Sequence, residues 1–179
     1  MIKRILLTVF TLMMIYSTLV IGIKLFEPDV IDTAAMEAQH STALDYNTLK
    51  DYTLNSGTSA SHFYLFSSID NTDCLYVENT VLKNAQAQTG MNLSELIEIV
   101  DITDLERSLS TNRLRTDWTV LSYPAFVACH VHEGEIVIDN TLEWNPASPM
   151  SSDDIERWLT LNGVYEGYNG EEAIATPAG

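Results

Sequence analysis

The segment His62–Ala85 constrains the fold of this chain more than any other part of the sequence. It begins with an apolar, aromatic run over Phe63–Phe66, which predicts a buried strand. A short polar stretch follows, and Cys74 then stands at the start of an amphipathic helix. The order of strand, tight turn and helix predicts an α/β domain with Cys74 near a helix N-terminus.

This segment resembles the redox-site segment of thioredoxin-like proteins, in which a Cys-x-x-Cys pair begins the helix. Here the corresponding residues are Asn71-Thr72-Asp73-Cys74, so an asparagine stands where the family has its attacking cysteine. In the family the first thiolate is stabilised by the helix N-terminus, and the second cysteine resolves the mixed disulfide. An asparagine amide does neither. The resemblance therefore implies a degenerate site without dithiol exchange.

Two alignments of Cys74 with the family motif remain open. In the first, Cys74 is the second cysteine, which is usually the more buried and the less nucleophilic one. In the second, Cys74 is the attacking cysteine and Val77 replaces its partner, which would leave a monothiol oxidoreductase. Cys74 also fits a third interpretation, as an ordinary small residue half-buried in a helix.

Tyr123-Pro124 carries the second half of the resemblance. In thioredoxin-like folds a cis-proline begins a strand and faces the redox pair, after a helix and a short loop. Proline is admitted at the first residue of a strand, which fits Pro124 before the predicted strand 125–131. The cis bond is implied by the resemblance alone, since most X-Pro bonds are trans. An ordinary trans proline at a strand entry is the alternative.

The remaining predicted elements complete this pattern. Strands are expected over 96–102, 125–131 and 135–140, and helices over 42–54, 104–109, 112–119 and 153–162. The order from His62 to Gly163 is βαβα–ββα, so the expected fold class is α/β. The resemblance implies a thioredoxin-like three-layer fold with a central mixed four-stranded sheet, and the helix over 42–54 is expected to pack on it.

The N-terminus predicts one transmembrane helix. Residues 5–25 are nearly all apolar, which matches the roughly 20 residues needed to span a bilayer. Lys3 and Arg4 precede them and favour a cytoplasmic N-terminus with an extracytoplasmic body. An uncleaved signal anchor in a single-pass cell-membrane protein is the preferred interpretation. A signal peptide cleaved near Thr33-Ala34-Ala35 is the alternative.

The predicted organisation has four parts. They are a signal anchor over 1–26, a stalk and preceding helix over 27–61, a thioredoxin-like domain over 62–163, and a flexible acidic tail over 164–179.

The charge of the chain limits its partners. The net charge is −16, and every acidic residue lies at Glu27 or later. Three of the nine basic residues belong to the anchor, so the exported part is still more acidic. Such a body repels nucleic acid and anionic lipid headgroups, and no nucleic-acid partner is expected.

No disulfide, metal site or cofactor is predicted. Cys129 lies five residues beyond Pro124 along a strand, about 15 Å from the Cys74 region, and a disulfide needs Cα atoms within about 7 Å. Two free thiols are therefore expected, with Cys129 in the core. His130 and His132 share a strand face, but no third ligand stands at a known zinc spacing.

These features predict a bacterial, membrane-tethered, extracytoplasmic thioredoxin-like module with a binding or accessory role. Its surface would consist of Asn71, Thr72, Asp73, Tyr123 and Pro124. The partner would be an extended peptide or a neighbouring membrane or envelope protein, because an exposed backbone beside a cis-proline can pair with an extended chain. The alternatives are a monothiol thiol-disulfide oxidoreductase with Cys74 as its catalytic residue, and a domain that only spaces a larger envelope assembly.

Overall fold

The computed structural model describes residues 13–14, 40–57 and 60–167. The chain divides into two compact units, Met1–Ile31 and Asp32–Gly179, and the fold belongs to the second. The predicted transmembrane segment, the stalk up to residue 39 and the tail beyond residue 167 lie outside the described residues, apart from Met13 and Met14. Within the described ranges no helix is both long enough and apolar enough to cross a membrane.

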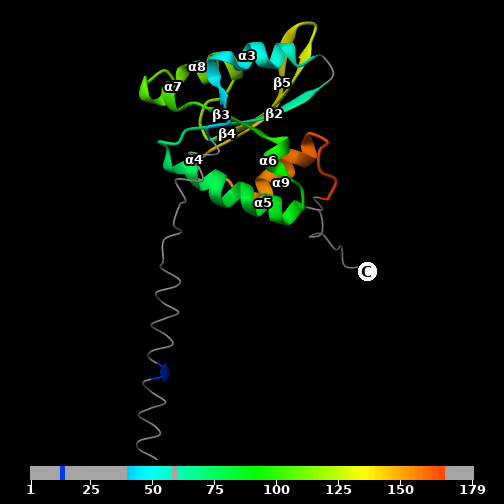
Figure 1. Ribbon diagram of the computed structural model, residues 1–179. Helices are drawn as coiled ribbons and strands as arrows, with labels where there is room; N and C mark the ends of the chain where they lie inside the picture. The colour runs from blue at the N-terminus through cyan, green and yellow to red at the C-terminus, as the bar shows by residue number, and fades with distance from the viewer. Residues whose placement is uncertain (1–12, 15–39, 58–59, 168–179) are drawn as a thin grey trace, which may run out of the picture. The chain divides into compact units, whose positions relative to one another are not determined.

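The described body contains a five-stranded sheet between two layers of helices (Figure 1). Its elements in chain order are β1 (Leu44–Asp45), α3 (Tyr46–Asn55), β2 (Ser61–Ser67), α4 (Thr72–Tyr76), the π-helical turn η1 (Val77–Val81), α5 (Leu82–Thr89), α6 (Leu93–Leu96), β3 (Glu98–Asp101), α7 (Thr103–Arg107), α8 (Asn112–Trp118), β4 (Ala125–His132), β5 (Glu135–Glu143) and α9 (Ser152–Leu161).

The strand order is β1-β3-β2-β4-β5. Strands β1 and β2 both run parallel to β3, whereas β4 runs antiparallel to β2 and to β5. This is the mixed sheet that the resemblance implied, with a helix between the parallel strands and a hairpin after them. The fold is thioredoxin-like.

The predicted four-stranded sheet is corrected to five strands by β1. This strand has two residues, and Leu44 and Asp45 pair with Val100 and Asp101 of β3. The sequence prediction placed these two residues inside a helix, because a two-residue strand is too short to show an alternating pattern. The helix begins later, at Tyr46, where the Asp45 carboxylate accepts a hydrogen bond from the Asn47 N–H and caps it.

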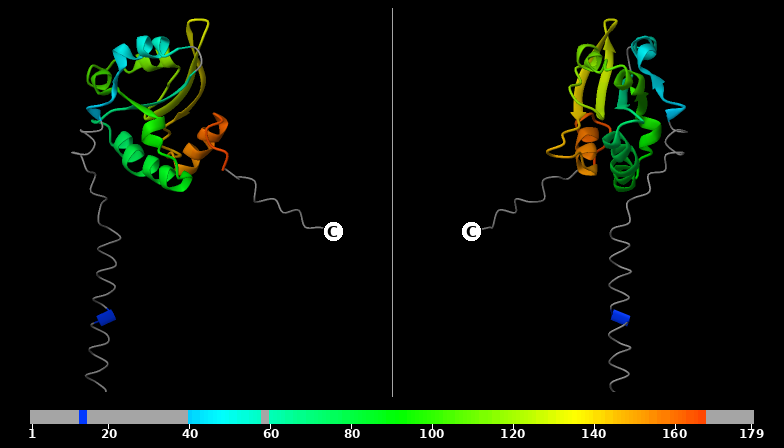
Figure 2. Two further views of the ribbon diagram at one scale, coloured as in Figure 1. Left: turned by 45° about the vertical axis from the view of Figure 1, so that its right-hand side comes forward. Right: turned by 90° about the vertical axis from the view of Figure 1, so that its left-hand side faces the viewer.

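Strand β2 is buried on both faces of the sheet, which explains its continuous apolar run. Phe63 and Leu65 belong to the core beneath the layer of α5 and α9, whereas Tyr64 and Phe66 belong to the core beneath α3, α7 and α8 (Figure 2). A tryptophan anchors each core: the ring centroid of Trp158 lies 5.7 Å from Phe63, and that of Trp118 lies 5.8 Å from Tyr64. The expected packing of the 42–54 helix on the domain is confirmed.

Local signals fix the ends of several elements. Gly90 ends α5 with a φ of +68°, a conformation that side chains with a Cβ rarely adopt. Ser151 and Asp154 form a capping box at the start of α9. The β4–β5 hairpin turns at Glu133 and Gly134, both with positive φ.

Removal of the Leu49 side chain tests whether α3 is an integral part of the domain. Leu49 is fully buried in the core under α3. We expect Leu49→Ala to lower the free energy of unfolding by about 2–5 kcal/mol, since it leaves a cavity. The matched change Asp51→Ala, at an exposed position of the same helix, should stay within about 0.5 kcal/mol. Urea denaturation measures both, and equal losses would contradict the packing described here.

Candidate functional site

Asn71 is the N-cap of α4. Its side-chain oxygen accepts hydrogen bonds from the backbone N–H groups of Asp73 (2.9 Å) and Cys74 (3.3 Å). The first N–H groups of a helix have no partner within the helix, and a side-chain acceptor satisfies them. A neutral amide oxygen therefore occupies the place at which a thiolate would accept the same hydrogen bonds.

Glu106, from α7, connects this helix start to the proline loop. Its Oε1 accepts hydrogen bonds from Asn71 Nδ2 (3.3 Å) and from the Tyr123 hydroxyl (3.1 Å). The Tyr123–Pro124 peptide bond is cis, as the resemblance implied. The structure thus brings Asn71 and Tyr123 together through a shared carboxylate. Glu106 was missed in the sequence, where it is one acid of a short charged helix without any motif.

The second oxygen of Glu106 makes this carboxylate unusual. Glu106 Oε2 is buried and has no hydrogen-bond partner among the described residues. The Glu106 side chain is half-buried, and its carboxylate lies within hydrogen-bond distance of the Asn71 side chain. Any group placed at position 71 is therefore exposed to a nearby negative charge.

Cys74 is a fully buried free thiol. Burial raises its pKa to about 12, and the charges of Glu78 and Glu106 add to the rise. Hydrogen bonds from the Ser68 backbone and the Ser67 side chain lower the pKa by less than burial raises it. The thiol is therefore neutral at any physiological pH. Cys129 is likewise a free thiol in the core, as predicted, and burial raises its pKa to about 12.

The loop before Pro124 is fixed by hydrogen bonds from β5 and the residues that follow it. Glu143 accepts the N–H groups of Leu121 (3.0 Å) and Ser122 (2.9 Å). The Trp144 N–H donates to the Pro124 carbonyl (3.0 Å), and the Ser122 hydroxyl donates to the Trp144 carbonyl. These contacts hold the backbone around the proline in one conformation.

The site is bordered by exposed apolar side chains. The side chain of Leu121 is 71% exposed. Tyr76 is also exposed and packs edge-on against Trp144, with ring centroids 6.1 Å apart. Thr72 is exposed and Asp73 is half-buried in the first turn of α4. The residues predicted for the binding surface lie at the start of α4 or at the cis-proline loop, but Pro124 is buried and Asn71 and Tyr123 are half-buried.

A second polar cluster lies deeper, behind Cys74. Glu78, in η1, is buried, and its Oε1 accepts hydrogen bonds from the Ser67 hydroxyl and from His40 Nε2 (3.0 Å). His40 Nδ1 lies 3.7 Å from Asp101 Oδ1, at the end of β3. No sequence motif marks this cluster, because its members come from four separate segments of the chain.

The ionisation of this cluster follows from its geometry. Burial alone would lower the pKa of His40, but Asp101 and Glu78 outweigh it and raise the pKa to about 9. Burial would raise the pKa of Asp101, yet His40 and Thr103 hold it at about 2. His40 is therefore a buried cation at neutral pH, with a carboxylate on either side.

The two strand histidines do not come together with further ligands. His130 Nδ1 lies 2.9 Å from Asp139 Oδ1, and the ring centroids of His130 and His132 are 6.4 Å apart. No group of three or more potential metal ligands occurs among the described residues.

Comparisons with known proteins give no closer identity. No family model matches the chain, and no curated protein matches it. A crystal structure of a Plasmodium falciparum thioredoxin is similar over 64% of this chain and 80% of that chain, with 16% sequence identity and a TM-score of 0.41. The thioredoxin-like fold rests on the strand order and on the cis-proline, and not on this likeness.

The His40 cluster should make stability depend on pH. The folded state binds the His40 proton more tightly than the unfolded state, whose histidine has a pKa near 6.5. The stabilisation is therefore complete below about pH 6.5 and is lost as pH rises through about 9. We expect the free energy of unfolding to fall over this window by on the order of 2–3 kcal/mol more than in His40→Gln. Urea denaturation at pH 6 and pH 9.5 tests this, and parallel pH profiles would refute it.

Proposed function

We propose that this chain is a membrane-tethered, extracytoplasmic thioredoxin-like module that has lost dithiol chemistry and binds an extended peptide segment of a partner protein. The observation that carries the proposal is the position of Asn71. Its amide caps the helix in place of a thiolate and is held by the Glu106 carboxylate. The site is built around a neutral amide.

The surroundings of Asn71 support the loss of redox chemistry. A reactive cysteine needs an electropositive, partly exposed position. Glu106 supplies negative charge there, and Cys74 is fully buried with a pKa of about 12. The burial of Cys74 also counts against a monothiol oxidoreductase that uses this residue. It favours the alignment of Cys74 with the second, more buried cysteine of the family.

The surface beside the cis-proline supports peptide binding. Leu121 is exposed in the loop before the cis-proline, and exposed Tyr76 packs against Trp144, which hydrogen-bonds to that loop. Exposed apolar side chains that gather on one surface are typical of interaction sites. Glu143 and Trp144 occupy the N–H groups of Leu121 and Ser122 and the Pro124 carbonyl, so an extended chain would pair with the backbone of Tyr123.

The tether is proposed from the sequence. The apolar run over residues 5–25, with Lys3 and Arg4 before it, is the expected anchor. A tethered domain of this kind would reach partners at the cell surface, either other membrane proteins or peptide segments of the envelope.

Two matched leucines test the binding surface. Leu121 and Leu161 are 71% and 72% exposed, but Leu121 adjoins the cis-proline loop, whereas Leu161 ends α9. Peptides would first be selected on the full chain from a random phage-displayed library. We expect Leu121→Asp to lower the affinity for the selected peptides at least about tenfold, because it puts a charge into an apolar contact. Leu161→Asp should leave their affinity unchanged.

The affinities are measured by fluorescence anisotropy with labelled peptides. Equal effects of the two substitutions would place binding elsewhere on the molecule. Failure to select any peptide that binds the full chain would also refute the proposed function.

Restoring the cysteine tests whether the site is adapted to an amide. The thiol introduced by Asn71→Cys would lie beside Glu106, whose charge raises a thiol pKa. We expect Asn71→Cys alone to reduce insulin poorly in the presence of dithiothreitol. Adding Glu106→Gln should raise the rate about threefold, since a pKa lower by one unit gives about ten times more thiolate but makes each thiolate about three times less nucleophilic.

The control adds Glu95→Gln to Asn71→Cys, which removes one exposed negative charge from α6. This control should reduce insulin no faster than Asn71→Cys. If Asn71→Cys alone turned over insulin as fast as the variant that also carries Glu106→Gln, Glu106 would have no part in excluding a thiolate.

A further inference from the structure

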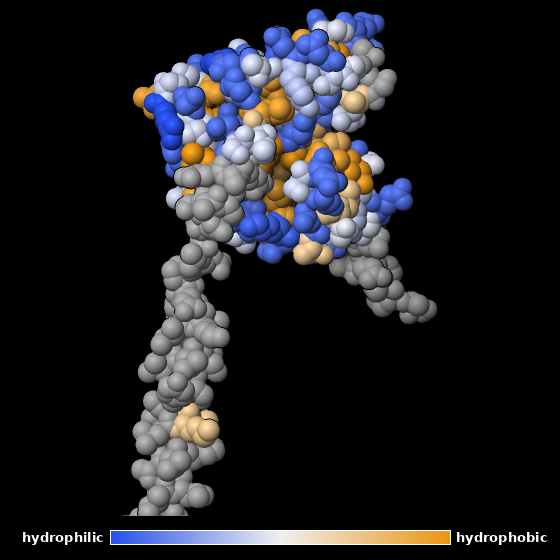
Figure 3. All heavy atoms as spheres, in the orientation of Figure 1, coloured by the Kyte–Doolittle hydropathy of each residue, from blue (hydrophilic) through white to orange (hydrophobic). Residues whose placement is uncertain are grey.

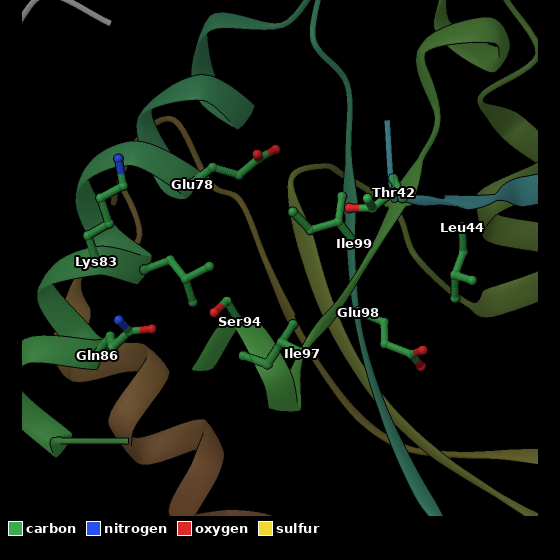
Figure 4. Close-up of a pocket in the computed structure, with 11 residues that line it drawn as sticks. Thr42, Leu44, Glu78, Lys83, Gln86, Ser94, Ile97, Glu98 and Ile99 are labelled. Atoms are coloured by element: carbon green, nitrogen blue, oxygen red, sulfur yellow. The ribbon is translucent and has the colours of Figure 1, made fainter. Parts of the chain in front are cut away.

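A cavity of about 540 Å³ lies between the helix formed by η1 and α5 and strand β3. Its apolar wall includes Leu82, Ile97 and Ile99, and Glu98 and Lys83 contribute charged groups (Figure 4). The space-filling view shows apolar side chains exposed between the layer of α5 and α6 and the layer of α3 (Figure 3). A cavity of this volume is typical of sites for small organic ligands.

Glu78 provides the one buried charge of this cavity. Its side chain is 1% exposed and points from the helix into the space between η1 and β3 (Figure 4). Both hydrogen bonds described above, from Ser67 and His40, go to Oε1, and Oε2 has no partner among the described residues. Glu78 lies in the π-helical turn η1, and such turns are frequent at functional sites.

The charges around Glu78 favour a cation. The carboxylates of Glu78 and Asp101 face one buried cation, His40, which leaves one negative charge in excess. Lys83 Nζ donates to Asn79 Oδ1 (3.1 Å), and among the described residues it makes no hydrogen bond to Glu78 Oε2. A buried carboxylate oxygen without a donor is costly, and a charged N–H donor offsets that cost.

We propose that this cavity binds an alkylammonium group. The ammonium donates to Glu78 Oε2, and the alkyl chain packs on Leu82, Ile97 and Ile99. The group belongs either to a free alkylamine or to a lysine side chain. This site does not rest on the function proposed for the Asn71–Pro124 surface.

Three ligands of equal length test the proposal on the purified full chain. Hexylamine, hexan-1-ol and hexanoate are titrated while the isoleucine methyl signals are followed by NMR. Hexylamine should shift the signals of Ile97 and Ile99 saturably, hexan-1-ol should bind at least about tenfold more weakly, and hexanoate should not bind. Equal affinity for the amine and the alcohol, or no saturable shift with the amine, overturns the proposal.

Two variants assign the contacts. Glu78→Gln should remove the preference for the amine over the alcohol, whereas Glu98→Gln should keep it. Because Glu78→Gln also disturbs His40 and could prevent folding, Leu82→Phe provides a second test by filling the cavity. It should abolish binding of the amine and leave Glu78 in place. Unchanged binding in Leu82→Phe overturns the site.

The source of the ammonium is decided by a fourth probe, lysine blocked as its N-acetyl N-methylamide. Tighter binding of hexylamine assigns the site to free amines, and tighter binding of the blocked lysine assigns it to a lysine side chain. Both results support the proposal, and saturable binding of neither probe overturns it.

Discussion

The free backbone N–H groups at the start of α4 need acceptors, and the Asn71 side chain serves two of them. The same side chain donates to Glu106, which also holds Tyr123 of the proline loop. An amide can do both because it carries an acceptor and a donor. A thiolate would satisfy the N–H groups but would face the Glu106 carboxylate as a like charge. Asn71 and Glu106 therefore depend on each other, and their hydrogen bonds connect the start of α4 to the proline loop.

Burial is the main cause of the raised pKa of the Cys74 thiol, and two carboxylates add to it. Glu78 and Glu106 both act on it, although they come from different helices. Each of these carboxylates leaves one oxygen without a hydrogen-bond partner among the described residues. Buried charge of this kind lowers stability unless it is compensated, so its presence beside the site points to a role other than packing. Both carboxylates raise the pKa of the Cys74 thiol between them.

The sequence predicted the parts of the fold that are set by local pattern. The apolar run of β2, the start of β4 after Pro124 and the final helix α9 each depend on neighbouring residues. The cis bond at Pro124 came from the family resemblance and not from local pattern. The two-residue strand β1 and the π-helical turn were missed, because neither has a period that a sequence can display.

The roles of Glu106 and Glu78 could not be predicted from local pattern, because their partners are distant in the sequence. Glu78 contacts His40, 38 residues earlier in the chain, and Glu106 contacts Asn71, 35 residues earlier. Such pairs form only when the sheet brings their elements together. The helix formed by α4, η1 and α5 carries Asn71 at its start and Glu78 within it. His40, at which the described body begins, is buried against Glu78 of this helix and Asp101 of β3. His40 thus holds the helix that begins at Asn71 against the end of β3.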